Sequence, residues 1–273
     1  MELLTISSRD QITDEVETIP ADAKGCFPAA EKNPRARSLR FRKEKPVIFL
    51  TSRVHPGETP GSHVLNGFLE MLCDLRSEQG KCLRKNYVFK VIMILNPDGV
   101  SRGYYRLDTM ACNLNRMYLN PSKADNPTIW ATRQAVVQQA EQYKCLKMFI
   151  DFHAHASKRG GFMFGNHITE HEKQADNITF VKLIAMNCLN FDMNECNFSD
   201  KIMAIKDRNG QSREGSSRVA LAKATGLTYC YTLEFNYHSG RRINTLAPKY
   251  ARATGTIEGE TELTDPQSKI YAN

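Results

Sequence analysis

Continuous apolar runs alternate with longer amphipathic stretches along this chain. Short apolar runs predict strands that are covered on both faces of a sheet. Apolar residues at helical spacing, such as Leu65, Phe68 and Leu72, predict helices. The predicted strands are Val47–Thr51, Val88–Leu95, Lys147–Phe152, Gly161–Phe164 and Thr228–Phe235, and the predicted helices are Pro60–Leu75, Pro127–Tyr143, Glu170–Asn190 and Ser216–Ala224.

This alternation predicts one α/β domain over residues 1–273, with a mixed, mostly parallel central sheet that is flanked by helices on both faces. Residues 1–45 are expected to form an irregular lead-in. Asp265 and Pro266 have the sequence of a helix start, yet only residues 267–273 follow them. We therefore expect the last covering helix to be missing.

Polar side chains gather where the predicted strands end. The first strand leads into His55 and Glu58, the second into NPDG (96–99), the third into His153, and the last carries Glu234. In open α/β sheets, ligands bind beyond the carboxyl ends of the strands. The sequence therefore predicts a functional site at one edge of the sheet.

The segment HPGE (55–58) places a histidine and a glutamate around a Pro-Gly turn. Two histidines and one carboxylate are a common ligand set of catalytic zinc. His55 and Glu58 can supply two ligands, and His153 the third. His155 competes with His153, because both side chains point to the same side of an extended segment. A hydrogen-bonded core histidine is the alternative for either of them.

A rival zinc motif lies at HITEH (167–171), which matches the pattern H-x-x-E-H. Such a site needs both histidines on one face of a helix that is braced by an apolar core. Here the segment reads as an exposed helix start, so the sequence favours the first ligand set.

Arginines follow the second strand closely, and Arg106 and Arg116 lie within the segment 96–118, with Asn115 beside the second of them. A guanidinium fork binds a carboxylate through two hydrogen bonds and stabilises an oxyanion as charge develops. Together with a zinc set and a glutamate base, these residues predict hydrolysis beside a free carboxylate.

Composition narrows the class of protein further. Hydrophobic residues make up 41% and charged residues 25% of the chain, as in globular proteins, and the longest uncharged run, 59–69, is too short to span a membrane. The net charge of +7 favours an acidic partner, but the basic run 33–45 reads as a solvated loop and no nucleic-acid motif accompanies it. The eight scattered cysteines predict a reduced, cytosolic protein.

Five motifs together resemble the metallocarboxypeptidases, and within them the cytosolic carboxypeptidases that trim glutamates from tubulin. The resemblance extends over about residues 40–244, and longer matches such as YTLEFNYHSGR point to one branch of that group. The motifs are HPGE (55–58), NPDG (96–99), NLNR (113–116), DFHAH (151–155) and YTLE (231–234).

The resemblance implies a role for each matching residue. One zinc ion per chain would be held by His55, Glu58 and His153, with Glu234 as the general base. Arg106 would polarise the scissile carbonyl, and Asn115 and Arg116 would bind the terminal carboxylate of the substrate.

Basic residues are expected to select acidic side chains. Arg218 is the candidate for reading the terminal side chain, and Lys158 and Arg159 would hold the next acidic residue. The alternative for Arg218 is an ordinary solvent-exposed helix residue.

The sequence also departs from the family pattern. Asn113 stands where secreted members carry an aspartate; its amide oxygen can accept a hydrogen bond from His55 without adding charge. No tyrosine matches the one that caps the substrate in the secreted enzymes. Nothing in residues 1–45 can supply the family's β-rich N-terminal domain, so we expect that domain to be absent and the chain to be a single, incomplete catalytic domain.

The resemblance implies that the protein removes C-terminal or branch-point glutamate from acidic tails, chiefly those of polyglutamylated tubulin. It also implies a location in the cytoplasm, in association with microtubules of the cytoskeleton or cilium. The nucleus is a further expected location. Neither nucleic acid nor membrane is an expected partner. The alternatives are a catalytically impaired protein of the same fold that binds acidic tails, and a zinc amidohydrolase that acts on small N-acyl amino acids.

Overall fold

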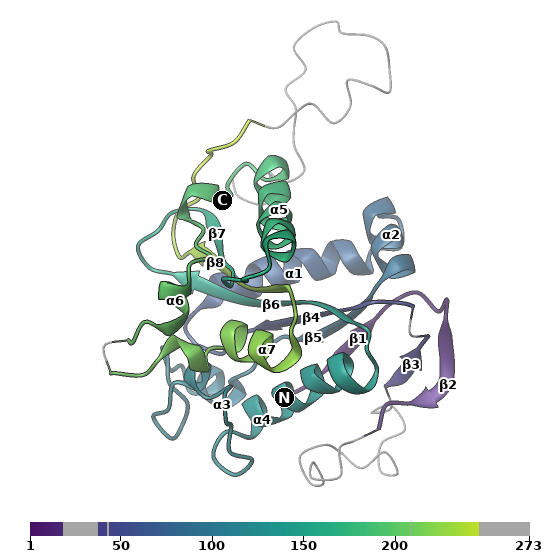
Figure 1. Ribbon diagram of the computed structural model, residues 1–273, viewed down its shortest axis with the longest axis horizontal. Coiled ribbons are helices and arrows are strands. Elements are labelled where there is room, and N and C mark those ends of the chain that lie inside the picture. Colours follow the sequence, from purple (N-terminus) through teal and green to yellow (C-terminus); the bar gives the residue numbers. More distant parts are fainter. Residues whose placement is uncertain (19–37, 43, 208, 246–273) are drawn as a thin grey trace, which may run out of the picture.

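The central element of the fold is a six-stranded, mostly parallel sheet (Figure 1). The computed structural model describes residues 1–18, 38–42, 44–207 and 209–245. The strand order is β1-β5-β4-β6-β8-β7, in which the four inner strands are parallel and β1 and β7 pair antiparallel at the two edges. The strands are β1 (Leu4–Ile6), β4 (Val47–Ser52), β5 (Val88–Ile92), β6 (Leu146–His155), β7 (Gly161–Phe164) and β8 (Tyr229–Asn236).

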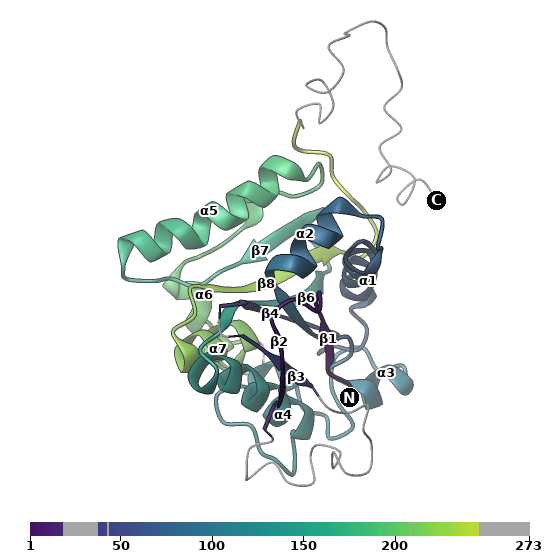
Figure 2. The same cartoon turned by 90° about the vertical axis from the view of Figure 1, so that its right-hand side faces the viewer.

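Helices cover both faces of this sheet (Figures 1 and 2). On one face lie α1 (Thr59–Cys73), α2 (Glu78–Asn86) and α5 (His171–Asn187). On the other lie α4 (Pro127–Val137), which continues as a π-helical turn over Gln138–Gln142, and α7 (Ser217–Thr225). Shorter helical segments are α3 (Pro97–Ser101), α6 (Asp200–Ala204) and the 3₁₀ turns η3 (Leu114–Arg116), η5 (Met193–Glu195) and η6 (Arg213–Gly215).

Two hydrophobic cores, one on each face, hold these layers together. Leu65 of α1 and Val181 of α5 pack on Ile150 of the sheet in the first core. Ile129 of α4 and Leu221 of α7 pack with Phe149 in the second. Ile150 and Phe149 are neighbours in β6, and because successive strand residues point to opposite faces, a continuous apolar run supplies both cores.

The predicted fold class is confirmed, and the predicted strands and long helices all exist, with ends that shift by a few residues. The second strand, expected over Val88–Leu95, ends at Ile92. Helix α2 was not predicted, because its stretch EQGKCLRKN is strongly polar. No described helix is long and apolar enough to cross a membrane.

The expectation of an irregular lead-in over residues 1–45 was wrong. This stretch contains β1, which extends the main sheet, and a small two-stranded sheet of β2 (Ile12–Val16) and β3 (Leu39–Phe41). These strands are only three to five residues long, too short for an alternating pattern to stand out from the sequence. The expected loss of a last helix concerns residues 246–273, which lie outside the described residues.

Candidate metal centre and active site

The motif HPGE forms the connection between β4 and α1. The chain leaves β4 at Ser52, and Glu58 occupies the N-cap position of the helix, with Pro60 in the first turn. The turn is held by a hydrogen bond from the Gly57 backbone N–H to the Tyr105 carbonyl, 2.8 Å long. A side chain at Gly57 would meet that carbonyl oxygen at 2.8 Å, so the close approach requires glycine.

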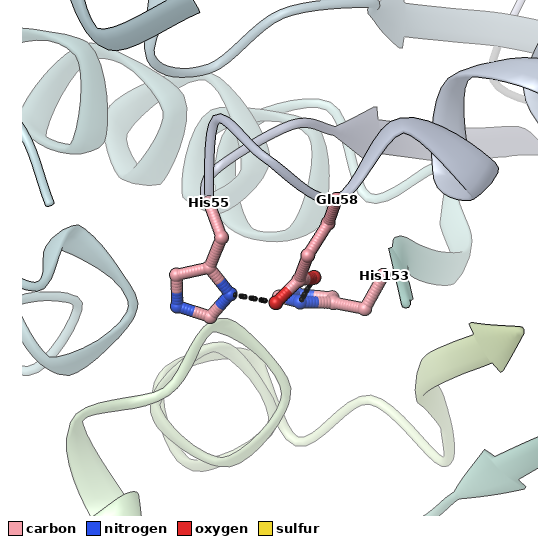
Figure 3. A group of neighbouring side chains, drawn as sticks. All are labelled: His55, Glu58 and His153. Carbon is pink, nitrogen blue, oxygen red and sulfur yellow. Dashed lines mark hydrogen bonds and ion pairs between the residues drawn. The ribbon is translucent and has the colours of Figure 1, made fainter. Parts of the chain in front are cut away.

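This turn brings three buried ligand groups together. One potential ligand atom from each of His55, Glu58 and His153 lies within 4.8 Å of the others, and this is the only such group of three or more among the described residues. Nδ1 of His55 is 2.7 Å from Glu58 Oε1, and Nδ1 of His153 is 2.8 Å from Glu58 Oε2 (Figure 3). Both histidines therefore turn the same nitrogen toward one point.

The outer nitrogen of each histidine has its own partner. Nε2 of His55 lies 3.1 Å from Oδ1 of Asn113, as the sequence predicted. Nε2 of His153 lies 2.9 Å from Oδ2 of Asp151, which is fully buried. Each ring is thus fixed in orientation from behind.

Glu234 faces this group from the neighbouring strand. In the register of β6 and β8 it lies opposite His153. Its Oε2 is buried and has no hydrogen-bond partner among the described residues. Burial raises the pKa of Glu234 to about 7. The nearby His153 acts to lower this pKa, and the Glu58 carboxylate acts to raise it. A buried carboxylate with a free oxygen and a pKa near neutrality suits a general base.

The charges within the group depend on one another. Burial opposes ionisation of Glu58, yet His55 and His153 hold the pKa of this carboxyl well below its usual range. Burial lowers the pKa of His55, whereas Asp151 and Glu58 together raise that of His153 although burial opposes them. The site therefore concentrates charge where little water enters.

These residues fit a zinc ion. Two imidazoles and one carboxylate are a standard catalytic ligand set, and both outer nitrogens are braced as in metal-bound histidines. Glu234 leaves one carboxylate oxygen unpartnered beside the set.

Of the segment 106–116, Arg106 was predicted to polarise the scissile carbonyl, and Asn115 and Arg116 to bind the terminal carboxylate. Nη1 of Arg106, whose side chain is 41% exposed, is 3.6 Å from Glu58 Oε1. Asn115 is buried, and its Oδ1 accepts a hydrogen bond from the backbone N–H of Ser217 at 3.0 Å. Arg116 already has a carboxylate partner, because its Nε donates to Oδ2 of Asp207 at 3.0 Å.

The three residues proposed to select acidic side chains differ in their surroundings. Arg218 is buried, and its Nη1 donates to the Gly165 carbonyl and to Oδ1 of Asn166; the alternative of a solvent-exposed helix residue was wrong. Lys158 pairs with the Glu195 carboxylate at 2.8 Å. Arg159 is exposed.

The structure places the competing histidines outside the group. His155 is partly exposed, and its Nδ1 accepts a hydrogen bond from the Lys158 backbone N–H at 3.2 Å. In the HITEH motif, His167 and His171 are exposed, and Glu170 pairs with Lys173. Only His171 of this motif lies within α5, so the two histidines do not share the face of one helix, as a zinc site of this kind needs.

Several residues near the site were not predicted from the sequence. Thr51, Asp151 and Ser217 meet behind His153. Tyr237 lies three residues past Glu234; burial, together with the nearby Glu58 carboxylate, raises the pKa of its phenol. Asp151, two residues before His153 in a strand, could have been found by its position, since both side chains share one face.

The zinc carboxypeptidase family model matches residues 1–238. The chain belongs to the zinc carboxypeptidase family. Among curated zinc carboxypeptidase relatives, cytosolic carboxypeptidase-like protein 5 of Danio rerio is 35% identical over 91% of this chain and 38% of its own length. The human protein of that name is 33% identical over 77% of this chain and 33% of its own. This agrees with the branch that the longer sequence motifs indicated.

Cytosolic carboxypeptidase 6 of Mus musculus is 36% identical over 74% of this chain and 36% of its own length. The chain thus spans about a third to two fifths of the curated relatives that it matches. Solved zinc carboxypeptidase structures share the fold: a metallo-carboxypeptidase from Burkholderia cenocepacia aligns with a TM-score of 0.56, 20% identity and coverage of 70% of this chain and 48% of that one. Carboxypeptidase A of Helicoverpa armigera aligns with a TM-score of 0.53 and 14% identity, and the alignment covers 76% of this chain and 58% of that one.

Proposed function

We propose that this protein is a zinc-dependent carboxypeptidase that removes C-terminal or branch-point glutamate from acidic protein tails, chiefly those of polyglutamylated tubulin. The observation that carries the proposal is the buried group of His55, Glu58 and His153, with the unpartnered carboxylate of Glu234 beside it. Family membership supports the reaction class, and the resemblance to cytosolic carboxypeptidases supports the substrate.

The zinc ion would be held by His55, Glu58 and His153, and when bound it supplies Lewis acidity and makes hydroxide available near neutral pH. Glu234 takes a proton from the attacking water and returns it to the leaving amine. Its pKa of about 7 allows both transfers near neutral pH. Arg106, close to Glu58 and partly exposed, donates to the carbonyl oxygen on which negative charge develops.

Asn115 and Arg116 would bind the terminal carboxylate of the substrate. They lie in η3, beside the segment that carries Asn113, the partner of His55. Arg116 Nε is paired with Asp207, so the substrate carboxylate either uses the remaining guanidinium hydrogens or displaces Asp207.

Arg218 is the proposed reader of the acidic side chain. It is buried, its charge acts on Glu234, and burial lowers its pKa to about 10. A desolvated, charge-assisted pair contributes about 1.5–3 kcal/mol, which corresponds to a preference of roughly tenfold to a hundredfold. Lys158 and Arg159 would hold the next acidic residue, although Glu195 already neutralises part of the Lys158 charge.

The proposed partners are glutamylated tails on tubulin and similar proteins, and hence microtubules. The names of the relatives support a place in the cytosol. The excess of seven positive charges favours an acidic partner.

Mass spectrometry of peptides that end in glutamate, glutamine or leucine, with and without a chelator, tests this function. We expect loss of a terminal glutamate that stops when the chelator is added. Glu234→Gln should keep zinc and fold but lose turnover, because an amide cannot take the proton of water. Arg218→Leu should lose most of the preference for glutamate.

Each outcome separates one part of the proposal. A chain that binds glutamate-tailed peptides without cleaving them would be an acidic-tail binder. Cleavage of small N-acyl amino acids but of no long acidic peptide would make it an amidohydrolase. If Arg218→Leu keeps the full preference for glutamate, Arg218 does not read the side chain.

A further inference from the structure

Seven buried residues form a closed ring of hydrogen bonds through the candidate metal centre, in which Asn115 and Ser217 each donate one bond from the backbone N–H. All seven are 6% exposed or less. In order around the ring they are Glu58, His55, Asn113, Asn115, Ser217, Asp151 and His153, linked by contacts of 2.7, 3.1, 3.2, 3.0, 2.6, 2.9 and, back to Glu58, 2.8 Å. The ring joins the metal ligands to Asn115.

The two sides of this ring differ in charge. Behind His55 stands Asn113, whose Oδ1 also accepts from the Asn115 backbone N–H, so the oxygen of the neutral amide faces the imidazole. Behind His153 stands the carboxylate of Asp151. Only His153 therefore has a charged outer partner in this ring.

Asp151 is itself held in place from two elements. Its Oδ1 accepts from the Thr51 hydroxyl in β4 at 2.7 Å, and its Oδ2 accepts from the Ser217 hydroxyl in α7 at 2.6 Å. A buried carboxylate with three donors is fully satisfied and has no reason to turn. Because a carboxylate only accepts, Nε2 of His153 must donate a proton to Asp151, so Nδ1, which faces Glu58, is the nitrogen that is left to bind a metal.

We propose that Asp151, braced by Thr51 and Ser217, is the positioning residue that fixes His153 in the tautomer and orientation needed to bind zinc. Ser217 has a second part, since its backbone N–H holds Asn115 while its hydroxyl holds Asp151. The helix that carries Ser217 thus ties the proposed carboxylate-binding residue to a proposed metal ligand. This inference rests on the proposed zinc site.

The first test measures the zinc dissociation constant of the wild-type chain and of Asp151→Asn by competition with a chromophoric chelator at fixed pH. We expect Asp151→Asn to bind zinc roughly tenfold to a hundredfold more weakly, since the amide is neutral and turns an N–H₂ group toward one of the three donors. Wild-type affinity in this variant would overturn the proposal.

Two milder variants keep the carboxylate and so keep the test open if Asp151→Asn does not fold. Thr51→Val and Ser217→Ala each remove one brace, and we expect zinc binding to weaken roughly two- to tenfold. Thr132→Val is the matched control, because this buried hydroxyl donates to the Thr128 carbonyl within α4 and contacts Sδ of Met1, and none of its partners belongs to the ring. A change in Thr132→Val equal to that in Thr51→Val would mean that general destabilisation explains the loss.

Asn113→Asp in the Asp151→Asn background separates position from charge. It puts a carboxylate behind His55 instead of His153. If Asp151 acts by positioning His153, zinc affinity should stay low in this double variant, because His153 still has no carboxylate behind it. Full recovery of zinc affinity would show that only the local charge matters and would overturn the proposal.

These readouts also keep the inference apart from the proposed function. If the wild-type chain binds zinc but leaves glutamate-tailed peptides intact, the substrate proposal fails and the zinc measurements still decide the role of Asp151. If the wild-type chain cleaves the peptides and Asp151→Asn binds zinc unchanged, only the inference on Asp151 fails.

Discussion

At the scale of single residues, the site combines groups whose burial would be costly without partners. Glu234 shows this most clearly, because it is buried with one oxygen unpaired and its pKa is raised to about 7. Such a group helps catalysis and harms stability, since the folded chain must keep a carboxylate away from water.

This cost gives a prediction for the metal-free protein. A carboxyl whose pKa is higher in the folded than in the unfolded chain makes the folded state less stable as pH rises from about 4.5 through about 7. Glu234→Gln removes the charge, so it should stabilise the metal-free protein at pH 8, by on the order of 3 kcal/mol, and change little at pH 4. Urea denaturation at both pH values measures this. An equal effect at both would show that Glu234 ionises normally.

The proposed zinc ligands give a second prediction at this scale. His55→Ala should abolish stoichiometric zinc, because it removes one of three buried ligands. His167→Ala is the control, since its imidazole is exposed and belongs to the rival HITEH motif. Zinc content of the purified proteins decides between the sites: loss in the second variant but not in the first would move zinc to HITEH.

At the scale of elements, the closeness of α1 to β6 sets the position of Glu58. Glu58 directly precedes α1, and the start of the helix lies against the strand that carries His153. The contact depends on Gly61, where an added Cβ would be 2.8 Å from the Phe152 carbonyl oxygen. Backbone cannot yield as a side chain can, so a larger residue must move the helix.

Two glycines of α1 provide a matched test. Gly61→Ala should lower the melting temperature and weaken zinc binding, because the displaced helix start carries Glu58 with it. Gly67→Ala, at an exposed position with nothing within 4 Å of the new Cβ, should stabilise the helix by about 0.5–1 kcal/mol and leave zinc binding unchanged. Thermal melts and chelator competition measure both. Equal behaviour of the two variants would contradict the close approach.

At the scale of the whole molecule, the N-terminal residues are fixed to the sheet by a buried charge. Lys90 lies in β5, is 1% exposed, and its Nζ contacts Glu17 Oε2 at 2.7 Å as well as the hydroxyls of Thr5 and Ser38. Burial lowers the pKa of Lys90, whereas the Glu17 carboxylate acts to raise it. Thr5, Glu17 and Ser38 are thus joined to the central sheet through one buried side chain.

Removal of Glu17 should therefore destabilise the whole domain. Glu17→Leu leaves the Lys90 ammonium buried without its counter-ion, and we expect a loss of about 3 kcal/mol. Because the depressed pKa of Lys90 makes the folded state bind fewer protons than the unfolded one, stability of this variant should rise with pH toward 10. Lys90→Met in the same background should recover most of the loss. Urea titrations measure the stability of both variants. If the variant with both Glu17→Leu and Lys90→Met is no more stable than Glu17→Leu alone, the proposed ion pair of Lys90 and Glu17 is contradicted.

The sequence by itself determined the layered α/β fold, because continuous apolar runs and helical spacing need no knowledge of neighbours. It also located the candidate metal group, since HPGE places two potential ligands within one turn and strand ends meet at one edge of the sheet. Only the tertiary structure decided between His153 and His155, because residues two apart in a strand point the same way and contacts alone separate them.

The tertiary structure alone also decided the roles of residues that meet from distant parts of the chain. Asp151 and Ser217 are 66 positions apart, and Lys90 and Glu17 are 73 apart, so no local pattern marks either pair. The short strands near the N-terminus were not predicted for a related reason. The buried pair and the edge of the sheet stabilise them, whereas sequence patterns report only local propensity and burial.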